Sequence, residues 1–199
     1  MRGKSTLTFA LPQNVIFAVK KYADALVEVA KRKEIDVKYQ HNLVEIRPDK
    51  KEAIFRKVDS GEDVVMKYDM IHVTPPMSSP DFLKNSPLAN KEGWVEVNND
   101  TLQHNRFKNI FGIGDCSSLP TSKTAAAIRK QTPVLVHNLL SKIDGTPLNE
   151  SYDGYTACPI VTGYGSLILA EFDYDKNPKE SFPFDQAQER YSMYVLKAY

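Results

Sequence analysis

The strongest constraint on the fold is a short apolar run that ends in a Gly-Asp pair and is followed by an alanine-rich segment. Residues 109–113 (Asn-Ile-Phe-Gly-Ile) predict a buried strand that ends at Gly114 and Asp115, and the residues over 121–140 predict a helix. In open α/β sheets, ligands bind at the carboxyl ends of strands. The pattern therefore predicts an α/β fold with a ligand site beside Asp115.

The loop after Asp115 carries groups suited to a polar, electron-rich ligand. Asp115 would accept hydrogen bonds from a polyol chain, and Lys123 would add a donor. The helix N-terminus, capped by Thr121 or Ser122, would offer N–H groups and partial positive charge to an electron-rich ring. An ordinary Gly-Asp turn before a capped helix is the alternative. The Ser-Lys-Thr-Ala-Ala-Ala run favours a cofactor site, because small side chains allow close approach to the backbone.

Short apolar segments predict further elements on both sides of this motif. Strands are predicted at 5–11, 35–38, 43–47, 70–74 and 93–97, a hairpin at 52–58 with 63–68, and a helix at 22–33. The strand at 70–74 is expected to be buried and to end at Pro75. Helices that alternate with short strands again indicate an α/β layer structure.

Composition excludes several classes of protein. The 199 residues carry a net charge of only +1, which argues against a dedicated nucleic-acid binder. The sequence has no apolar run of roughly eighteen residues, and residues 1–12 resemble neither a signal nor a transit peptide. Two cysteines are too few for a disulfide scaffold, and the four histidines lack metal-ligand spacing, so no metal site is expected.

A second motif surrounds Cys158. The run 152–164 (Tyr-Asp-Gly-Tyr-Thr-Ala-Cys-Pro-Ile-Val-Thr-Gly-Tyr) places a cysteine before a proline in an aromatic- and Thr-rich segment. A reactive thiol there would need a lowered pKa, because the thiolate is the nucleophile. The alternative is a buried, inert cysteine, which spacing alone favours.

Taken together, the motifs resemble one enzyme family along nearly the whole chain. The segments that carry the resemblance are Thr74-Pro-Pro-Met77, Phe111–Cys116, Leu119–Ala127, Tyr152–Pro159, Ile168–Tyr174, Phe182–Gln186 and Glu189–Tyr194. They closely resemble the mitochondrial type of sulfide:quinone oxidoreductase. The resemblance implies two Rossmann-like dinucleotide-binding domains, bound FAD, a pair of redox cysteines, and electron transfer from hydrogen sulfide through flavin to ubiquinone. It also implies an aromatic-rich C-terminal segment and peripheral attachment to the mitochondrial inner membrane.

The resemblance assigns roles to individual residues. Asp115, with Gly114, would hold the ribityl chain of FAD, and Lys123 and Thr124 would lie at the pyrimidine end of the flavin. Cys158 would be the redox cysteine that carries sulfane sulfur and releases it to an acceptor. Cys116 matches no redox position and is expected to be structural.

The chain also departs from the family pattern. Family members are about twice as long, and the G-x-G-x-x-G motif and the region of the partner cysteine are missing here. The chain therefore resembles a C-terminal half. We expect residues 1–88 to be part of the second, NADH-domain-like unit, residues 89–150 to supply the last strand and helix of the FAD unit, and residues 151–199 to form the redox-cysteine and quinone-side segment.

Two alternatives remain open from the sequence. One is a related FAD-dependent NADH:quinone reductase, which would not need Cys158. The other is a truncated remnant without enzymatic activity. In either case an incomplete chain is expected to expose apolar surface, to bind FAD weakly and to self-associate.

Overall fold

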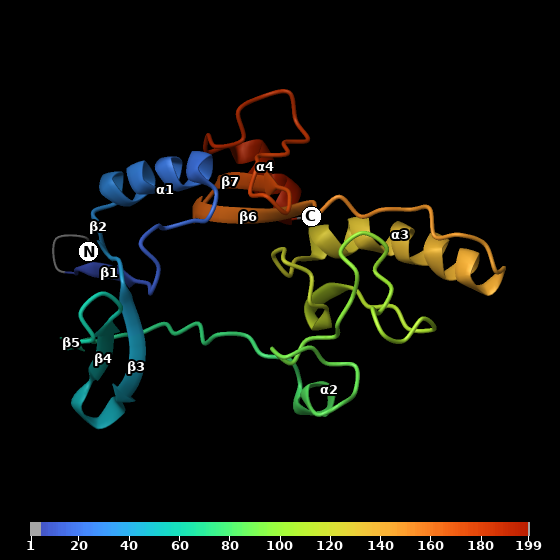
Figure 1. Cartoon of the computed structure of the whole chain (residues 1–199). Coiled ribbons are helices and arrows are strands. Elements are labelled where there is room, and N and C mark those ends of the chain that lie inside the picture. Colours follow the sequence, from blue (N-terminus) through green and yellow to red (C-terminus); the bar gives the residue numbers. More distant parts are fainter. Residues whose placement is uncertain (1–4, 199) are drawn as a thin grey trace. The chain divides into compact units, whose positions relative to one another are not determined.

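A computed structural model describes residues 5–198 and divides them into two compact units, up to Pro75 and from Pro76 onward (Figure 1). The division falls between two adjacent prolines, and residues 151–198 belong to the same compact unit as residues 76–150. Helices and strands are mixed along the chain, in agreement with the predicted α/β content.

The first unit begins with a β-α-β motif. Strand β1 (Leu7–Ala10) pairs in parallel with β2 (Ile35–Lys38), and helix α1 (Lys20–Arg32) connects them. Parallel neighbours need such a crossover, and the amphipathic spacing in 22–33 supplies it. The buried face of α1 carries Tyr22, Ala23, Val29 and Ala30.

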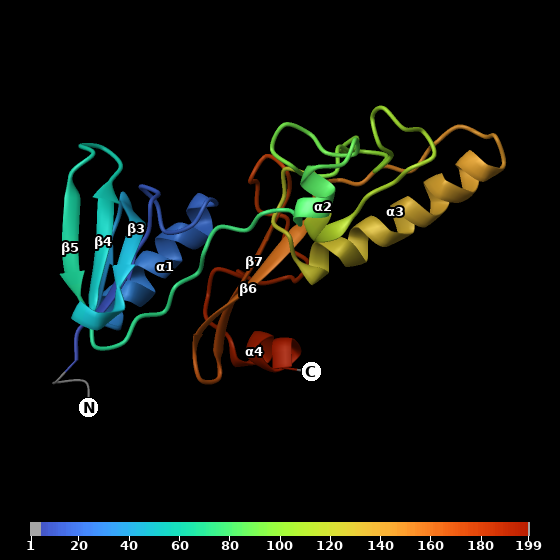
Figure 2. The same ribbon diagram turned by 90° about the horizontal axis from the view of Figure 1, so that it is seen from below.

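A three-stranded antiparallel sheet completes this unit. The strands β3 (His41–Arg47), β4 (Glu52–Lys57) and β5 (Asp63–Lys67) lie side by side in that order (Figure 2), and the short 3-10 helix η2 (Pro48–Lys50) forms the first turn. The central strand buries Ala53, Ile54 and Phe55. The predicted hairpin is confirmed.

The predicted buried strand at 70–74 is wrong. This segment pairs with no strand among residues 5–198, and the Met70 side chain is 88% exposed. The last sheet contact is the hydrogen bond from the Tyr68 amide to the Lys51 carbonyl, after which the chain leaves the sheet toward Pro75. Apolar composition suggested a strand, but a strand also needs a backbone neighbour.

The second unit holds the motifs singled out in the sequence. Its elements are α2 (Asp81–Lys84), the 3-10 helix η3 (Gly114–Cys116), α3 (Ala125–Ile143), the strands β6 (Thr156–Gly163) and β7 (Ser166–Phe172), and α4 (Tyr191–Ala198). Strands β6 and β7 form an antiparallel hairpin. Helix α3 continues through Pro133 and extends beyond the predicted end at residue 140.

The predicted strands at 93–97 and 109–113 are not formed as strands. They contribute only isolated bridges, such as Val95 with Ser117 and Phe111 with Gln103. The 93–97 segment changes its partner from residue to residue: Val95 pairs with two segments and Val97 with a third, at His104. Neither segment forms a continuous ladder; Val95 and Val97 are buried, whereas Ile110, Phe111 and Ile113 are only half-buried.

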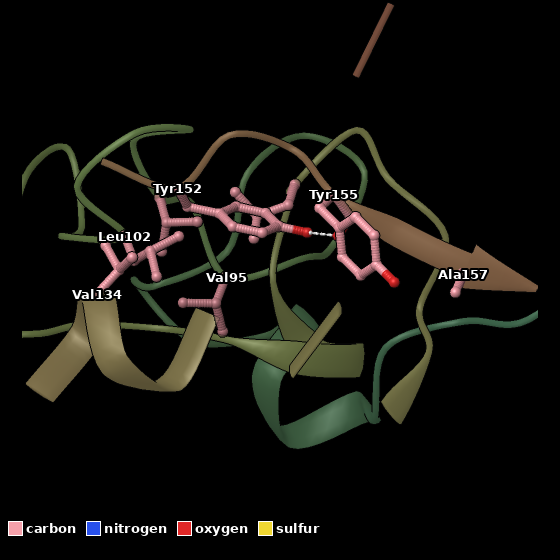
Figure 3. Packing of buried hydrophobic residues seen from close by; sticks show 8 residues of the cluster. Val95, Leu102, Val134, Tyr152, Tyr155 and Ala157 are labelled. Atoms are coloured by element: carbon pink, nitrogen blue, oxygen red, sulfur yellow. Dashed lines mark hydrogen bonds between the residues drawn. The ribbon is translucent and has the colours of Figure 1, made fainter. Parts of the chain in front are cut away.

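The core of the second unit joins residues that are far apart in sequence. Figure 3 shows the Tyr152 ring packed beside Leu102 and Val95, with its hydroxyl donating to the Tyr155 carbonyl. The remaining members of the cluster are Val97, Leu119, Val134 and Ala157. The segment before Cys158 is therefore anchored in the same core as the segment before Gly114.

Candidate functional site

The Gly-Asp pair forms a tight turn against helix α3. Gly114 has φ of +70°, a left-handed conformation that favours glycine, and a Cβ there would lie 3.1 Å from the Ile128 side chain. Its amide donates to the Gln131 Oε1 at 2.9 Å, and Gln131 is buried. The turn is therefore fixed to α3 by a buried side chain that the sequence reasoning did not single out.

Asp115 follows this turn with an exposed side chain. Its carboxylate is thus open to a ligand from outside this chain, and its role in binding a polyol stays a prediction. An exposed carboxylate also fits an ordinary turn, so exposure alone does not choose between the two interpretations.

Lys123 is already engaged within the chain. Its Nζ donates to the Ser117 carbonyl at 2.6 Å and lies 4.2 Å from the centre of the Trp94 ring. Burial lowers the pKa of Lys123, and Asp115 and Cys116 oppose this effect. Lys123 therefore ties the loop to the segment around Trp94 and places a positive charge near Asp115.

Helix α3 begins two or three residues later than the sequence predicted. Thr124, not Thr121 or Ser122, is the N-cap: its Oγ1 accepts from the Ala127 amide at 3.1 Å. Thr121 instead donates to the Gly154 carbonyl at 3.3 Å. The first amides of a helix lack intrahelical partners. At Ala125 and Ala126 the side chains beside these amides are only methyl groups.

Strand β6 is attached to the loop that precedes α3. The Thr156 hydroxyl donates to the Ser122 carbonyl at 3.2 Å and lies 3.0 Å from the Thr124 hydroxyl. Together with the bond from Thr121 to Gly154, these contacts bring the Cys158 strand to the loop that follows Asp115. The structure thus joins the two motifs that the sequence identified separately.

Cys158 is half-buried on β6 and pairs in register with Ala170. Burial raises the pKa of the Cys158 thiol, while a hydrogen bond with the Ser122 side chain and the charge of Lys176 lower it. The net direction is upward, opposite to the lowered pKa that a thiolate nucleophile needs. In this chain Cys158 is therefore held mainly as a thiol at neutral pH.

Cys116 has a different setting. Its Sγ donates to the Ile113 carbonyl at 3.4 Å and it packs against the core cluster. Both cysteines are free thiols. This packing agrees with a structural role for Cys116, which stays a prediction.

A buried carboxylate organises the opposite side of the hairpin. Glu171 on β7 is 3% exposed and accepts from the Tyr155 hydroxyl, from the Ser181 amide at 2.7 Å and hydroxyl at 3.0 Å, and from the Gln186 Nε2 at 2.7 Å. Burial, followed by the contact with Glu171, raises the pKa of Tyr155 to about 12. Glu171 therefore fixes residues 181–186 to the strands that carry Cys158.

The aromatic residues of segment 151–198 differ in how far they are buried. Tyr155 and Phe172 are buried in the fold, whereas Tyr164 and Tyr191 are exposed. Two more, Phe182 and Phe184, stack with ring centres 5.4 Å apart, and the Arg190 guanidinium lies 4.2 Å from the Phe184 ring. Tyr194 on α4 is half-buried.

Residues 5–198 provide neither a set of metal ligands nor a membrane-spanning helix. These residues contain no cluster of histidine, cysteine and carboxylate side chains that could hold a metal ion. None of their helices is long and apolar enough to cross a membrane.

Comparison with known sequences places the chain beside one group of enzymes. No family model matches it. Three curated proteins named mitochondrial sulfide:quinone oxidoreductase match nearly all of it: those of Mus musculus (52% identical over 99% of this chain), Dictyostelium discoideum (50% over 100%) and Schizosaccharomyces pombe (43% over 99%). The chain spans 44% of the length of each. The resemblance inferred from the motifs is confirmed.

Solved structures with the same arrangement are also found. The sulfide:quinone oxidoreductase of Aquifex aeolicus is similar with a TM-score of 0.83 at 18% identity, over 99% of this chain and 48% of that one. A chain in the cryo-EM structure of the Tetrahymena thermophila mitochondrial ATP synthase is similar with a TM-score of 0.77 at 30% identity, over 90% of this chain and 43% of that one. The first likeness, at its low identity, bears on the fold alone.

Proposed function

We propose that this chain forms part of an FAD-dependent sulfide:quinone oxidoreductase, which oxidises hydrogen sulfide and passes the electrons to ubiquinone. The observation that carries the proposal is the attachment of the Cys158 strand to the loop between Asp115 and α3. A sulfur-carrying group and a flavin-binding turn must lie close together for electrons to pass between them. The similarity to the mitochondrial mouse enzyme, over 99% of this chain, supports the same assignment.

The proposed chemistry begins with a disulfide between Cys158 and a cysteine outside this chain. Hydrosulfide attacks the Cys158 sulfur, the S–S bond breaks, and the partner cysteine leaves as a thiolate while Cys158 becomes a persulfide. A sulfane-sulfur acceptor then removes the outer sulfur and releases Cys158. Re-forming the disulfide frees two electrons, and bound FAD would supply the means to carry them to ubiquinone.

Several residues suit the flavin. The exposed Asp115 carboxylate would accept from the ribityl hydroxyls, and the neighbouring Gly114 lines one small pocket together with Thr124, the N-cap of α3. Lys123, whose Nζ is held by the Ser117 carbonyl, would place its positive charge near the flavin. The pocket lined by Gly114, Lys123 and Thr124 has an empty volume of only about 180 Å³, which is too small to enclose a cofactor of the size of FAD.

We assign the segments as the family likeness suggests. Residues 1–88 belong to a second Rossmann-like unit, residues 89–150 to the end of the FAD unit, and residues 151–199 to the cysteine- and quinone-side segment. Of the tail aromatics, the Phe182–Phe184 stack and the exposed Tyr164 and Tyr191 are available to a flat quinone ring, because Tyr155 and Phe172 are occupied by the core. The whole protein would contact the mitochondrial inner membrane peripherally.

The 199-residue chain is expected to bind FAD weakly. The flavin-facing turn is present, but a Gly-rich turn for the pyrophosphate is not part of this sequence. Fluorescence titration of the purified chain should give no stoichiometric complex.

In a chimera that joins the chain to the unmatched part of the mouse relative, Asp115→Ala should lower flavin occupancy, whereas Asp81→Ala should not. Unchanged flavin content in Asp115→Ala would remove Asp115 from the site.

The chain is also expected to self-associate through α3. This helix exposes Val136, Leu139, Leu140 and Ile143, and the Ile143 side chain is 70% exposed. A continuous apolar face on a helix favours association with another surface. Sedimentation velocity should show oligomers, and Leu140→Lys with Ile143→Lys should shift them to monomer. A wild-type chain that sediments as a monomer would contradict this expectation.

A further inference from the structure

We propose that Trp94 is a positioning residue for Lys123, and that its ring holds the Lys123 ammonium at a fixed place in the loop between Asp115 and α3. The inference rests on the proposed function only in taking the charge of Lys123 as one that faces the flavin. It goes further than that function, because none of the sequence motifs includes Trp94.

Two neutral groups hold the Lys123 ammonium. Its Nζ donates to the Ser117 carbonyl at 2.6 Å and lies 4.2 Å from the centre of the Trp94 ring. A cation within about 6 Å of the ring centre is attracted by the negative face of the ring, and indole attracts it best among the aromatic side chains. Ser117 therefore fixes one N–H group, and Trp94 attracts the same charged group through its ring.

The segment that carries Trp94 is fixed by its own backbone. The Val95 amide donates to the Cys116 carbonyl at 2.8 Å, and the Ser118 amide donates to the Val95 carbonyl at 2.9 Å. The Trp94 amide donates to the Asn90 Oδ1 at 2.9 Å, and the Asn90 amide donates to the Trp94 carbonyl at 2.8 Å. These bonds tie the segment to residues 116–118, which accept the ammonium, and none of them involves the lysine itself.

The positive charge of Lys123 remains available in this arrangement. A carbonyl oxygen and a ring face attract an ammonium without neutralising its charge. Burial lowers the pKa of Lys123, because the ammonium has lost part of its hydration, and the charge of Asp115 opposes this effect. A partly buried charge is also screened less by salt than one on a free surface side chain. Trp94 therefore makes the charge of Lys123 a fixed part of the site.

NMR of the 199-residue chain tests whether the ammonium lies over the ring. Reductive methylation with ¹³C-formaldehyde converts lysine to dimethyl-lysine, which keeps its charge and one N–H for the Ser117 carbonyl. Methyl groups over the face of an indole ring resonate upfield of those on solvated lysines. The Lys123 signal, identified by its absence in Lys123→Arg, should therefore lie upfield of the signals of exposed lysines.

The mobility of the same methyl groups tests whether Trp94 holds the lysine. Their ¹³C relaxation should show restricted motion in the wild-type chain and the free motion of a solvated lysine in Trp94→Leu. Trp94→Phe, which keeps an aromatic face, should restore part of the restriction. Phe107→Leu removes another half-buried ring from the same unit and should leave the Lys123 signal and its relaxation unchanged.

A double-mutant cycle in the chimera separates a positioning role from a structural one. A fixed positive charge beside the flavin favours its reduced, more negative form. Lys123→Met and Trp94→Leu should therefore each lower the midpoint potential of the bound flavin. Adding Trp94→Leu to Lys123→Met should lower the potential no further, because Trp94 acts through the lysine. An equal effect of Trp94→Leu in both backgrounds would assign Trp94 a structural role and overturn the proposal.

Failure of this proposal and failure of the proposed function give different results. A Lys123 signal among those of exposed lysines in the wild-type chain would overturn the role of Trp94, even if no Trp94 variant folds. That result would leave the proposed function intact, because sulfide would still reduce the flavin of the chimera. A chimera whose flavin is not reduced by sulfide would remove the proposed function, and the NMR measurements on the chain alone would still decide whether Trp94 holds Lys123.

Discussion

Replacing Cys158 by alanine is expected to abolish sulfide-dependent flavin reduction in a chimera of this chain with the unmatched part of the mouse relative. Without the Cys158 sulfur no disulfide forms and hydrosulfide has no S–S bond to attack. Enzymes that lose the residue on which the covalent intermediate forms lose rate by factors on the order of 10³ or more. Anaerobic stopped-flow absorbance of the flavin after addition of sulfide and a sulfane-sulfur acceptor measures the rate directly.

Cys116→Ser is the matched control for this experiment. Cys116 packs against the core and donates to the Ile113 carbonyl, a bond that a serine hydroxyl can replace. Flavin reduction should therefore continue in Cys116→Ser. If sulfide still reduced the flavin of Cys158→Ala at the wild-type rate, Cys158 would be an inert cysteine, as its raised pKa permits.

Replacing Glu171 by alanine is expected to destabilise the second unit by about 3–5 kcal/mol, since each buried donor left without a partner costs about 1–3 kcal/mol. The Tyr155 hydroxyl loses its acceptor, the Gln186 side-chain amide keeps only its bond to the Leu169 carbonyl, and Ser181 loses two bonds to the same carboxylate. Such a loss is a large share of the roughly 5–15 kcal/mol that holds a typical domain folded.

Urea unfolding followed by tryptophan fluorescence suits this measurement. Trp94 is the single tryptophan and lies in the same unit as Glu171, so its signal follows that unit and not the first one. Glu171→Gln should lose less stability than Glu171→Ala, because its carbonyl still accepts. Glu92→Ala, at an exposed turn, should leave the midpoint unchanged. If the urea midpoint of Glu171→Ala equalled that of the wild type, the hydrogen bonds to Glu171 would not stabilise the second unit as proposed.

Local patterns in the sequence were sufficient for elements whose neighbours are close in the chain. The helix at 22–33, the hairpin at 52–68 and the long helix near 121–140 are present with shifted ends. The strands at 70–74, 93–97 and 109–113 failed because their partners are set by the tertiary fold. A run of apolar side chains indicates burial, but a ladder requires a continuous neighbour.

The same distinction applies to the candidate site. The sequence identified Asp115, Lys123 and Cys158, but it could not show that Ser117 holds Lys123 or that Thr156 attaches β6 to the loop. Those contacts join segments far apart in sequence. The cluster of threonines and serines around both motifs was the available signal, because buried hydroxyls must find partners.

Other contributors carried no local signal. Gln131 and Glu171 are polar residues in a helix and a strand, and only the structure shows that both are buried and hydrogen-bonded. The aromatic residues of 151–198 carried an ambiguous signal in the sequence, because quinone contact and core packing favour the same residue types. Tyr155 and Phe172 belong to the core, which leaves the Phe182–Phe184 stack as a better target for quinone-site variants.

The measurement that tests the central claim most directly is the location of sulfur after sulfide treatment. The chimera is oxidised, mixed with sulfide without acceptor or quinone, digested and analysed by mass spectrometry. The account predicts one added sulfur atom on the peptide that carries Cys158, lost when a sulfane-sulfur acceptor is supplied, and none on the peptide that carries Cys116. An unmodified Cys158 in the sulfide-treated sample without acceptor would contradict it.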